Sequence, residues 1–182
     1  MPALKFRVIL DNIEDQEIFR DVVVNDDHCF TDFFETILES FDLQNDQMAS
    51  FFVSDHEWNK GEEIALMDMN YDGDEDSIKL MEDEIIRSYL TSPKQRFILV
   101  YDFMSMYIFL IELQEILDNR VEQPEVLLSV GLLTPALKQK IASQADNMLF
   151  DTDIMDNLQE DFDGDFDGND FGDFENIDDY EL

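Results

Sequence analysis

Residues 95–116 read Gln-Arg-Phe-Ile-Leu-Val-Tyr-Asp-Phe-Met-Ser-Met-Tyr-Ile-Phe-Leu-Ile-Glu-Leu-Gln-Glu-Ile, and this stretch decides the fold. Two apolar runs rich in β-branched and aromatic residues flank a very short connection, which predicts two adjacent strands and most simply a hairpin. A lone hairpin is not stable in water and needs more strands or a helix against its apolar face. The stretch therefore predicts a larger sheet, of which these two strands are a part.

Further elements are predicted on both sides of this hairpin. Short β-rich runs predict strands at residues 4–10, 17–24, 49–54 and 63–67. Helical spacing of apolar residues predicts helices at residues 30–41, 77–90 and 135–148. Thr31 is the expected cap of the first helix, and Pro135 is expected in the first turn of the last.

The order of these elements predicts an α+β fold, with a mixed, mostly antiparallel sheet and helices packed on one face. Residues 1–150 are expected to form this single domain. Residues 151–182 are rich in Asp, Glu and Gly, and no Lys or Arg follows Lys140. Clustered like charge with glycine buries too little apolar surface to offset chain entropy, so an acidic, largely disordered tail is predicted there.

The charge balance restricts the classes of partner. The chain has 45 acidic and 11 basic residues, a formal net charge of −34. This balance opposes direct binding to nucleic acid and to anionic membranes, and it favours basic protein surfaces or divalent cations unless it serves only solubility. A single cysteine, Cys29, excludes an internal disulfide. With no signal-peptide pattern and no apolar run of about 20 residues, a cytoplasmic location is expected.

Four stretches, taken in order, resemble the plasmid ORF-three-like family, whose members are often described as passenger proteins of insertion sequences. They are Leu-Lys-Phe-Arg-Val-Ile-Leu-Asp-Asn-Ile at residues 4–13, Glu-Ile-Phe-Arg at 17–20, the helix at 30–41 with the following 48–51, and Tyr-Asp-Phe at 101–103. The resemblance covers about residues 4–116. It implies an association with mobile elements and carries no biochemical activity over to this chain.

Most of the polar signature of that family is replaced here. Arg20 and Asp102 remain, whereas the second Arg of the family falls at Asp21. The Gly-Asp pair of the family falls at Met104 and Ser105, its Trp at Tyr107, and its two histidines at Gln47 and Phe109. A site that family members build from those side chains is therefore largely missing.

A ligand pocket is one interpretation of the remaining polar residues. Strand alternation would place Asp102 opposite Tyr101 and Phe103, where it faces solvent or pairs with Arg20; a buried pair of this kind is a functional candidate. His56 and Trp58 either line a pocket or belong to a surface loop with the aromatic ring packed back on the sheet, and the polar surroundings favour the loop.

Metal binding is predicted to be weak or absent. Asp68, Asn70 and Asp72 match the first half of a calcium loop, but Lys79 stands where the bidentate Glu should be. A similar half-match at residues 163–168 also lacks this ligand. One cysteine and two distant histidines do not suit zinc. A solvated acidic loop is the expected structure, with no cofactor.

Aromatic residues recur in the acidic tail, at Phe162, Phe166, Phe171 and Phe174. Disordered interaction segments often show this alternation, because the charges keep the aromatics in water until a partner binds them. A tail that serves only solubility is the other interpretation, and the sequence leaves both open.

The sequence thus favours a non-enzymatic protein-interaction module with a basic protein partner. The alternative is an enzyme or a small-molecule-binding domain, with a pocket near Arg20, His56, Trp58, Tyr101 and Asp102. No phosphate-binding glycine loop or nucleophile elbow supports a particular reaction. The oligomeric state stays open.

Overall fold

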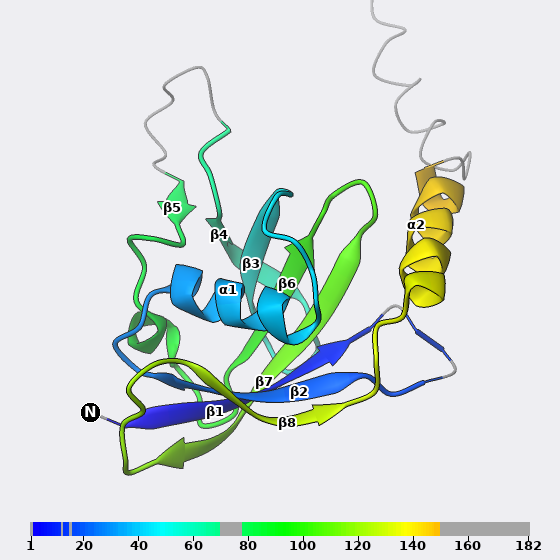
Figure 1. The fold of residues 1–182 in the computed structure, drawn as a ribbon. Coiled ribbons are helices and arrows are strands. Elements are labelled where there is room, and N and C mark those ends of the chain that lie inside the picture. Colours follow the sequence, from blue (N-terminus) through cyan, green and yellow to red (C-terminus); the bar gives the residue numbers. More distant parts are fainter. Residues whose placement is uncertain (1, 12, 15, 70–77, 150–182) are drawn as a thin grey trace, which may run out of the picture. The chain divides into compact units, whose positions relative to one another are not determined.

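The computed structural model describes residues 2–11, 13–14, 16–69 and 78–149, with side chains up to residue 146. Their helices and strands are shown in Figure 1. They are β1 (Ala3–Leu10), β2 (Phe19–Asn25), α1 (Phe30–Ser40), β3 (Ala49–Ser54), β4 (Lys60–Ala65), β5 (Lys79–Leu80), a short 3-10 helix (Ile86–Tyr89), β6 (Arg96–Tyr101), β7 (Tyr107–Leu117), β8 (Glu125–Val130) and α2 (Pro135–Leu149). The chain divides into two units, Met1–Asp146 and Asn147–Leu182, and the pockets and surfaces described in the next subsection lie in the first.

The strands form one eight-stranded sheet in the order β5-β4-β3-β6-β7-β1-β2-β8. Each pairing is antiparallel except that of β4 with β5, so the predicted mixed, mostly antiparallel α+β sheet is confirmed. The predicted central hairpin is β6 and β7, with Tyr101 paired to Tyr107. Because β7 also pairs with β1, the hairpin joins both halves of the sheet.

Helix α1 covers one face of the sheet and supplies the largest part of the core (Figure 1). Its expected apolar residues are all buried, namely Phe30, Phe33, Phe34, Ile37, Leu38 and Phe41. The Phe33 ring stacks on Phe51 of β3 at a centroid distance of 5.8 Å. The helical spacing was thus a correct guide to the buried face.

Both ends of α1 have local explanations. The expected cap at Thr31 is wrong, because the N-cap is Cys29, whose backbone N–H donates to the Asp32 carboxylate at 3.3 Å. At the other end Asp42 adopts a left-handed conformation with φ of 55°. The N–H of Leu43 then reaches back to the Leu38 carbonyl at 2.9 Å, which closes the helix as a Schellman motif.

The predicted helix at residues 77–90 is wrong over its described part. This segment instead forms β5, a turn and the 3-10 helix. Its carbonyls are used by α1: the N–H groups of Phe30 and Thr31 donate to Glu84 and Met81 at 3.1 and 3.2 Å. The first N–H groups of a helix have no partner within it, so tertiary hydrogen bonds here override the helical spacing of the segment.

Strand β8 was not predicted, whereas α2 confirms the expected last helix. Ile141 and Ala145 of α2 are buried, at 1% and 3% exposure, and Ile141 belongs to the same core as α1. The predicted tail at residues 151–182, with Phe162, Phe166, Phe171 and Phe174, lies outside the described residues.

Candidate functional site

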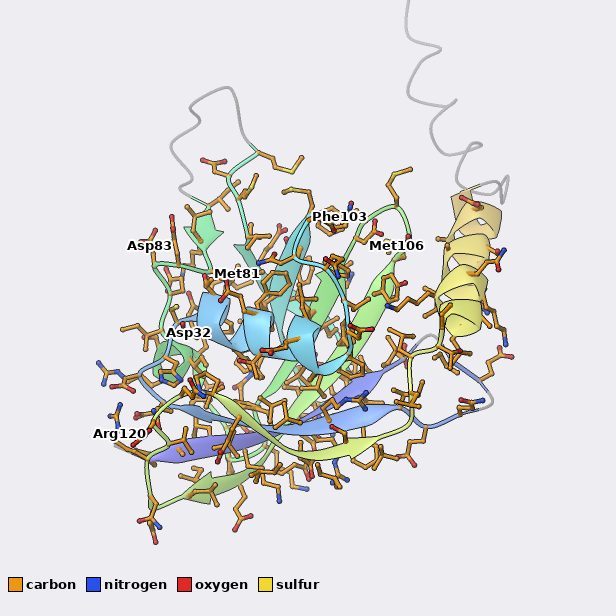
Figure 2. The ribbon with its side chains drawn as sticks, viewed as in Figure 1. Asp32, Met81, Asp83, Phe103, Met106 and Arg120 are labelled. Atoms are coloured by element: carbon orange, nitrogen blue, oxygen red, sulfur yellow. The ribbon has the colours of Figure 1, made fainter. Side chains whose placement is uncertain are left out.

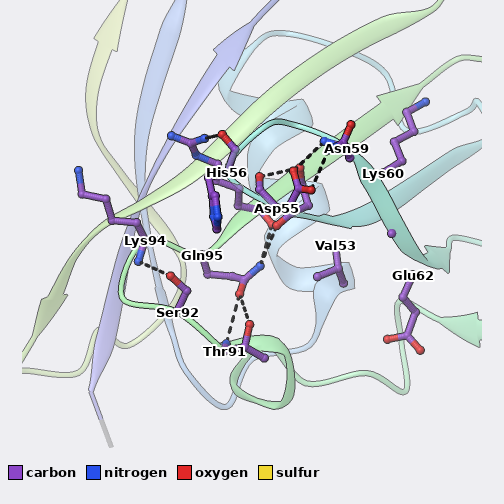
Figure 3. Close-up of a pocket in the computed structure, with 13 residues that line it drawn as sticks. Val53, Asp55, His56, Asn59, Lys60, Glu62, Thr91, Ser92, Lys94 and Gln95 are labelled. Atoms are coloured by element: carbon purple, nitrogen blue, oxygen red, sulfur yellow. Dashed lines mark hydrogen bonds between the residues drawn. The ribbon is translucent and has the colours of Figure 1, made fainter.

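A pocket of about 410 Å³ opens between the β3–β4 loop and residues 91–96 (Figure 3). Basic side chains gather in its lining: His56, Lys60, Lys94 and Arg96. The carboxylates of Asp55 and Glu62 line it as well. A volume of this size lies in the range of about 300–1,000 Å³ that is usual for small-molecule sites.

The β3–β4 loop is organised by Asp55. One carboxylate oxygen accepts the backbone N–H groups of Glu57 and Asn59 at 2.8 and 3.0 Å, and the other accepts the Asn59 amide at 2.8 Å. The Asn59 side-chain bond first, and then the backbone bonds, hold the pKa of Asp55 below its usual value. This carboxylate is therefore anionic and already engaged by its own loop.

Arg96 fastens the loop to the sheet. Its guanidinium forms an ion pair with Glu112 of β7 at 2.6 Å and donates to the His56 carbonyl. It also lies over the Trp58 ring, 4.6 Å from the centroid, as a cation–π contact. Trp58 therefore packs against the sheet through Arg96, while His56 lines the pocket.

The buried Gln95 connects the two walls of the pocket. Its side-chain oxygen accepts the Thr91 hydroxyl at 2.9 Å, and its amide donates to the carbonyls of Arg96 and Ser54 at 2.9 and 3.4 Å. Since both of its polar atoms are satisfied inside the protein, Gln95 positions the pocket wall and leaves ligand contacts to its neighbours.

Arg20 lies elsewhere and is enclosed by backbone carbonyls. It is 4% exposed and donates to the carbonyls of Ser40, Phe19 and Val130 at 2.8, 2.8 and 2.9 Å. The guanidinium also lies 4.5 Å from the centroid of the Phe41 ring. Burial lowers the pKa of Arg20. Its role is to tie β2, β8 and the end of α1 together.

The expected position of Asp102 within a strand is wrong. Asp102 follows β6 in the β6–β7 turn with φ of 55°, and its carboxylate accepts the N–H groups of Met104 and Ser105 at 3.1 and 3.2 Å. No ion pair joins it to Arg20 in the described structure. Two strands, β7 and β1, separate β6 from β2, which places them about 14 Å apart across the sheet.

Tyr101 is a core residue whose hydroxyl lies at the edge of the core. It is 3% exposed and donates to the Gln44 carbonyl. Burial first, and then nearby Asp46 and Asp102, raise the pKa of Tyr101 to about 12. The five predicted pocket residues therefore divide into three places, and His56 alone among them lines the pocket between the β3–β4 loop and residues 91–96.

An exposed apolar surface, which the sequence analysis missed, lies at the other end of β3 and β6. Large side chains share it: Met67, Met69, Phe103 and Met104 are 54%, 61%, 41% and 71% exposed. We call these four residues the methionine surface; Figure 2 shows Phe103 there, in the β6–β7 turn. Three of them, with Met48 and Ile78, line a pocket of about 210 Å³. The repeated triplets Met-Asp-Met and Met-Ser-Met at residues 67–69 and 104–106 were the available signal.

Carboxylates surround the methionine surface. Glu63 lines its pocket and is exposed, and the exposed Asp68 stands between the two methionines at 67 and 69. Within the described residues no group of three or more His, Cys, Asp or Glu is arranged to hold a metal. Asn70 and Asp72 of the half calcium loop lie outside the described residues, so weak calcium binding there stays a prediction.

The positions that depart from the family signature have structural roles here. Asp21 makes a two-pronged ion pair with Arg7 of β1, at 2.8 and 2.9 Å, and is buried. Phe109 is fully buried and lies 4.9 Å from the Phe41 ring, centroid to centroid. A neutral or charged histidine at that position would lack a polar partner in this core.

The chain belongs to the plasmid pRiA4b ORF-3-like protein family, whose model matches residues 2–135. This confirms the resemblance and extends it beyond residue 116. No protein of described function matches the chain in a search of curated proteins.

One similar solved structure is the crystal structure of the protein of unknown function MM3350 from Methanosarcina mazei Go1. The two share 17% sequence identity with a TM-score of 0.59, over 70% of this chain and 68% of that one. At this identity the likeness shows a shared fold. No helix in the described part of this chain is long and apolar enough to cross a membrane.

Proposed function

We propose that this chain is a non-enzymatic protein-interaction module that binds a basic amphipathic helix of a partner protein on its methionine surface. The observation that carries the proposal is the exposure of Met67, Met69, Phe103 and Met104, of which the first three line a pocket of about 210 Å³. Contiguous apolar patches of this kind commonly mark interaction sites. Methionine suits such a surface because its flexible thioether side chain adapts to different apolar partners.

Charge selects the kind of partner. Glu63 and Asp68 lie beside the apolar residues, and the whole chain carries a formal net charge of −34. Such a field steers cationic partners toward the surface and disfavours acidic ones. The expected partner therefore presents Lys or Arg around an apolar stripe.

The position of the surface in the sheet favours a helix over a strand. Met67 and Met69 follow β4, whose outer neighbour is β5, the edge strand of the sheet. Because β5 is only two residues long, it offers few backbone groups to an added strand. A helix needs only a groove for its side chains and brings its own backbone hydrogen bonds.

The test uses a defined probe, an 18-residue peptide of Leu and Lys with helical amphipathic spacing, and a scrambled peptide of the same composition. We expect the amphipathic peptide to bind more tightly in fluorescence anisotropy. Met67→Gln with Met104→Gln should weaken it about tenfold, because apolar burial is lost at unchanged charge.

The chain offers a matched control at β8. Leu127 and Leu132 are 54% and 76% exposed, close to Met67 and Met104 at 54% and 71%. Leu127→Gln with Leu132→Gln should therefore leave peptide affinity unchanged. Equal affinity for both peptides, or an equal loss of affinity in both variants, would show that the acidic chain attracts the peptide by its charge without a defined binding site.

The tail is proposed to contribute a second contact to the same basic partner. Replacing Phe162, Phe166, Phe171 and Phe174 with Ala should speed dissociation of the partner, since contact area is lost, and leave the association rate unchanged, since charge is kept. Unchanged dissociation rates would leave solubility as the role of the tail.

A further inference from the structure

Three of the nine methionines of this chain line a single pocket, the one of about 210 Å³ at the methionine surface. They are Met48, Met67 and Met69, and the last two are 54% and 61% exposed. None of the described residues in this lining is Leu or Val, although either would supply apolar surface equally well. The repeated use of thioether side chains at one place therefore points to a role for their sulfur atoms.

The backbone brings these methionines together from two segments of the chain. The pairing of β3 with β4 extends to Ala49 and Leu66, where the Leu66 N–H donates to the Ala49 carbonyl at 3.0 Å. Met48 precedes Ala49 and Met67 follows Leu66, so the two methionines are neighbours across the strand pair. Met69 comes two residues later and lines the same pocket. Three thioether groups thus surround one small cavity.

The rest of the lining suits a positively charged ion. Glu63 contributes a carboxylate, and the exposed Asp68 lies between Met67 and Met69 in the sequence. Phe103, labelled in Figure 2, contributes an aromatic ring, and the faces of such rings attract cations. No Lys or Arg is among the described residues of this lining, so no basic side chain there competes with a bound cation.

We infer that this pocket binds a soft monovalent metal ion of the Cu(I) class through the thioether sulfurs of Met48, Met67 and Met69. Thioethers are soft, neutral ligands that favour Cu(I), whereas Ca²⁺ and Mg²⁺ need oxygen ligands. Methionine is unbranched and has three rotatable bonds, so the exposed side chains can turn their sulfurs toward one ion. The Glu63 carboxylate offsets the single positive charge of that ion.

The inference shares residues with the proposed protein-binding surface but does not rest on it. Binding of an amphipathic helix needs apolar area, which Leu supplies as well as Met, whereas binding of the metal ion needs the sulfur atoms. Substitution of Met by Leu therefore separates the two activities, because it should remove the metal ion and retain the peptide.

The probe is Ag(I), a redox-stable ion that prefers the same soft ligands, titrated as the nitrate into the full chain in chloride-free buffer. The parent and all variants carry Cys29→Ser, because the free thiol of Cys29 would bind the same ion. NMR signals of isotope-labelled methionine methyl groups report which side chains take part. We expect those of Met48, Met67 and Met69 to shift and to saturate at about one equivalent, and excess Ca²⁺ should not reverse the shifts.

Met67→Leu with Met69→Leu removes two of the three ligands and keeps apolar side chains of similar volume. Loss of even a supporting partner of a metal ligand typically costs about 10–100-fold in affinity, so this variant should bind Ag(I) at least about tenfold more weakly. Met104→Leu with Met106→Leu is the matched control. It removes the other Met-x-Met pair, which is not among the described residues of the lining, and it should bind Ag(I) like the parent.

Shifts confined to other methionines, no shifts at all, displacement of Ag(I) by Ca²⁺, or equal weakening in the pocket and control variants would overturn the inference. The outcomes for the two activities are distinguishable in the parent chain. Binding of the amphipathic peptide without binding of Ag(I) would overturn the metal site alone. Binding of Ag(I) at the three methionines without binding of the peptide would support the metal site and overturn the proposed helix-binding surface.

Discussion

At one end of strands β3 and β6 the surface is polar and four basic side chains line a pocket, whereas at the other end it is apolar with two exposed carboxylates beside it. Ser54 pairs with Arg96 at the first end, and Ala49 pairs with Tyr101 at the second. The two ends share one strand pair and one core, yet their surfaces suit different kinds of ligand. The difference shows that this sheet acts as a rigid support, and that the chemistry lies in the turns at its ends.

Both turns are built in a similar way. Asp55 at the polar end and Asp102 at the apolar end each accept two backbone N–H groups of the residues that follow. Each turn also contains a residue with positive φ: Trp58 at 63° in the first, Asp102 and Met106 at 55° and 56° in the second. The side-chain bonds of Asp hold these turns in a conformation that L-residues adopt at a cost.

The largest effect is expected from a substitution in the core that supports both ends of β3 and β6. Phe51 lies in the middle of β3, is fully buried and contacts the rings of Phe30 and Phe33. Phe51→Ala should lower the free energy of unfolding by about 3–5 kcal/mol, because it leaves a cavity in a packed core. Urea unfolding followed by circular dichroism measures this.

Phe103→Ala is the control for that change. Its side chain is 41% exposed at the methionine surface, so the cost should stay below about 1 kcal/mol. A similar loss in both variants would mean that Phe103 belongs to the core and that the methionine surface is not a free face.

How far the sequence predicts this structure depends on how local each interaction is. The β6–β7 hairpin and the buried face of α1 could be predicted from the spacing of apolar residues in the sequence, because within each element the repeat of apolar residues matches the repeat of buried positions. The 77–90 segment had helical spacing too, but its carbonyls serve the first turn of α1, a contact that crosses the chain. No local pattern shows where such donors lie.

Strand β8 and the pocket show the same limit. Val126, Leu127 and Leu128 are all exposed, since β8 is an edge strand whose pairing with β2 shifts register between Asp21 and Val22. Its sequence therefore lacks the alternation of a half-buried strand. The pocket is lined by residues between 53 and 62 and between 91 and 96, which are distant in the chain, so no local pattern brings them together.

Alkaline pH should weaken the fold through its buried tyrosines, of which Tyr101 and Tyr107 lie at the apolar end and Tyr89 lies in the 3-10 helix. The pKa of Tyr101 is raised to about 12 and that of Tyr107 is also raised, mainly by burial in both cases. The folded state thus favours the neutral phenol, so this stability is complete below the usual tyrosine pKa of about 10 and is lost as pH rises through the folded value.

Unfolding temperatures measured from pH 8 to 12 should fall steeply above about pH 10. Tyr101→Phe removes the ionisable hydroxyl that donates to the Gln44 carbonyl, so this variant should fall less steeply over the same range. Parallel curves for the variant and the parent chain would contradict a role of Tyr101 in the alkaline transition.

A smaller effect is expected from the turn at the apolar end. Asp102→Ala removes the two N–H contacts and places at positive φ a residue that tolerates this conformation less well than Asp, which should cost about 1–2 kcal/mol. Asp102→Asn keeps an acceptor oxygen and tolerates this conformation, so urea unfolding should show most of the stability retained. A loss in Asp102→Asn as large as that in Asp102→Ala would show that the carboxylate charge matters more than the turn.

The smallest effect is expected at the polar end, where acidic pH rather than alkaline pH should cause the loss of stability. The pKa of Asp55 is held below its usual value by the Asn59 side chain and by backbone N–H groups. Its contribution is therefore complete above the usual Asp value of about 3.9 and is lost as pH falls through the lower folded value. Because the loop is exposed, the change should be local: the amide NMR signals of Glu57 and Asn59 should shift below about pH 4. Asp55→Asn should abolish the acid shift at Glu57 and Asn59 and leave the signals of the β6–β7 turn unchanged. If both turns of this variant respond alike, the two ends of β3 and β6 are coupled through the sheet and do not act independently.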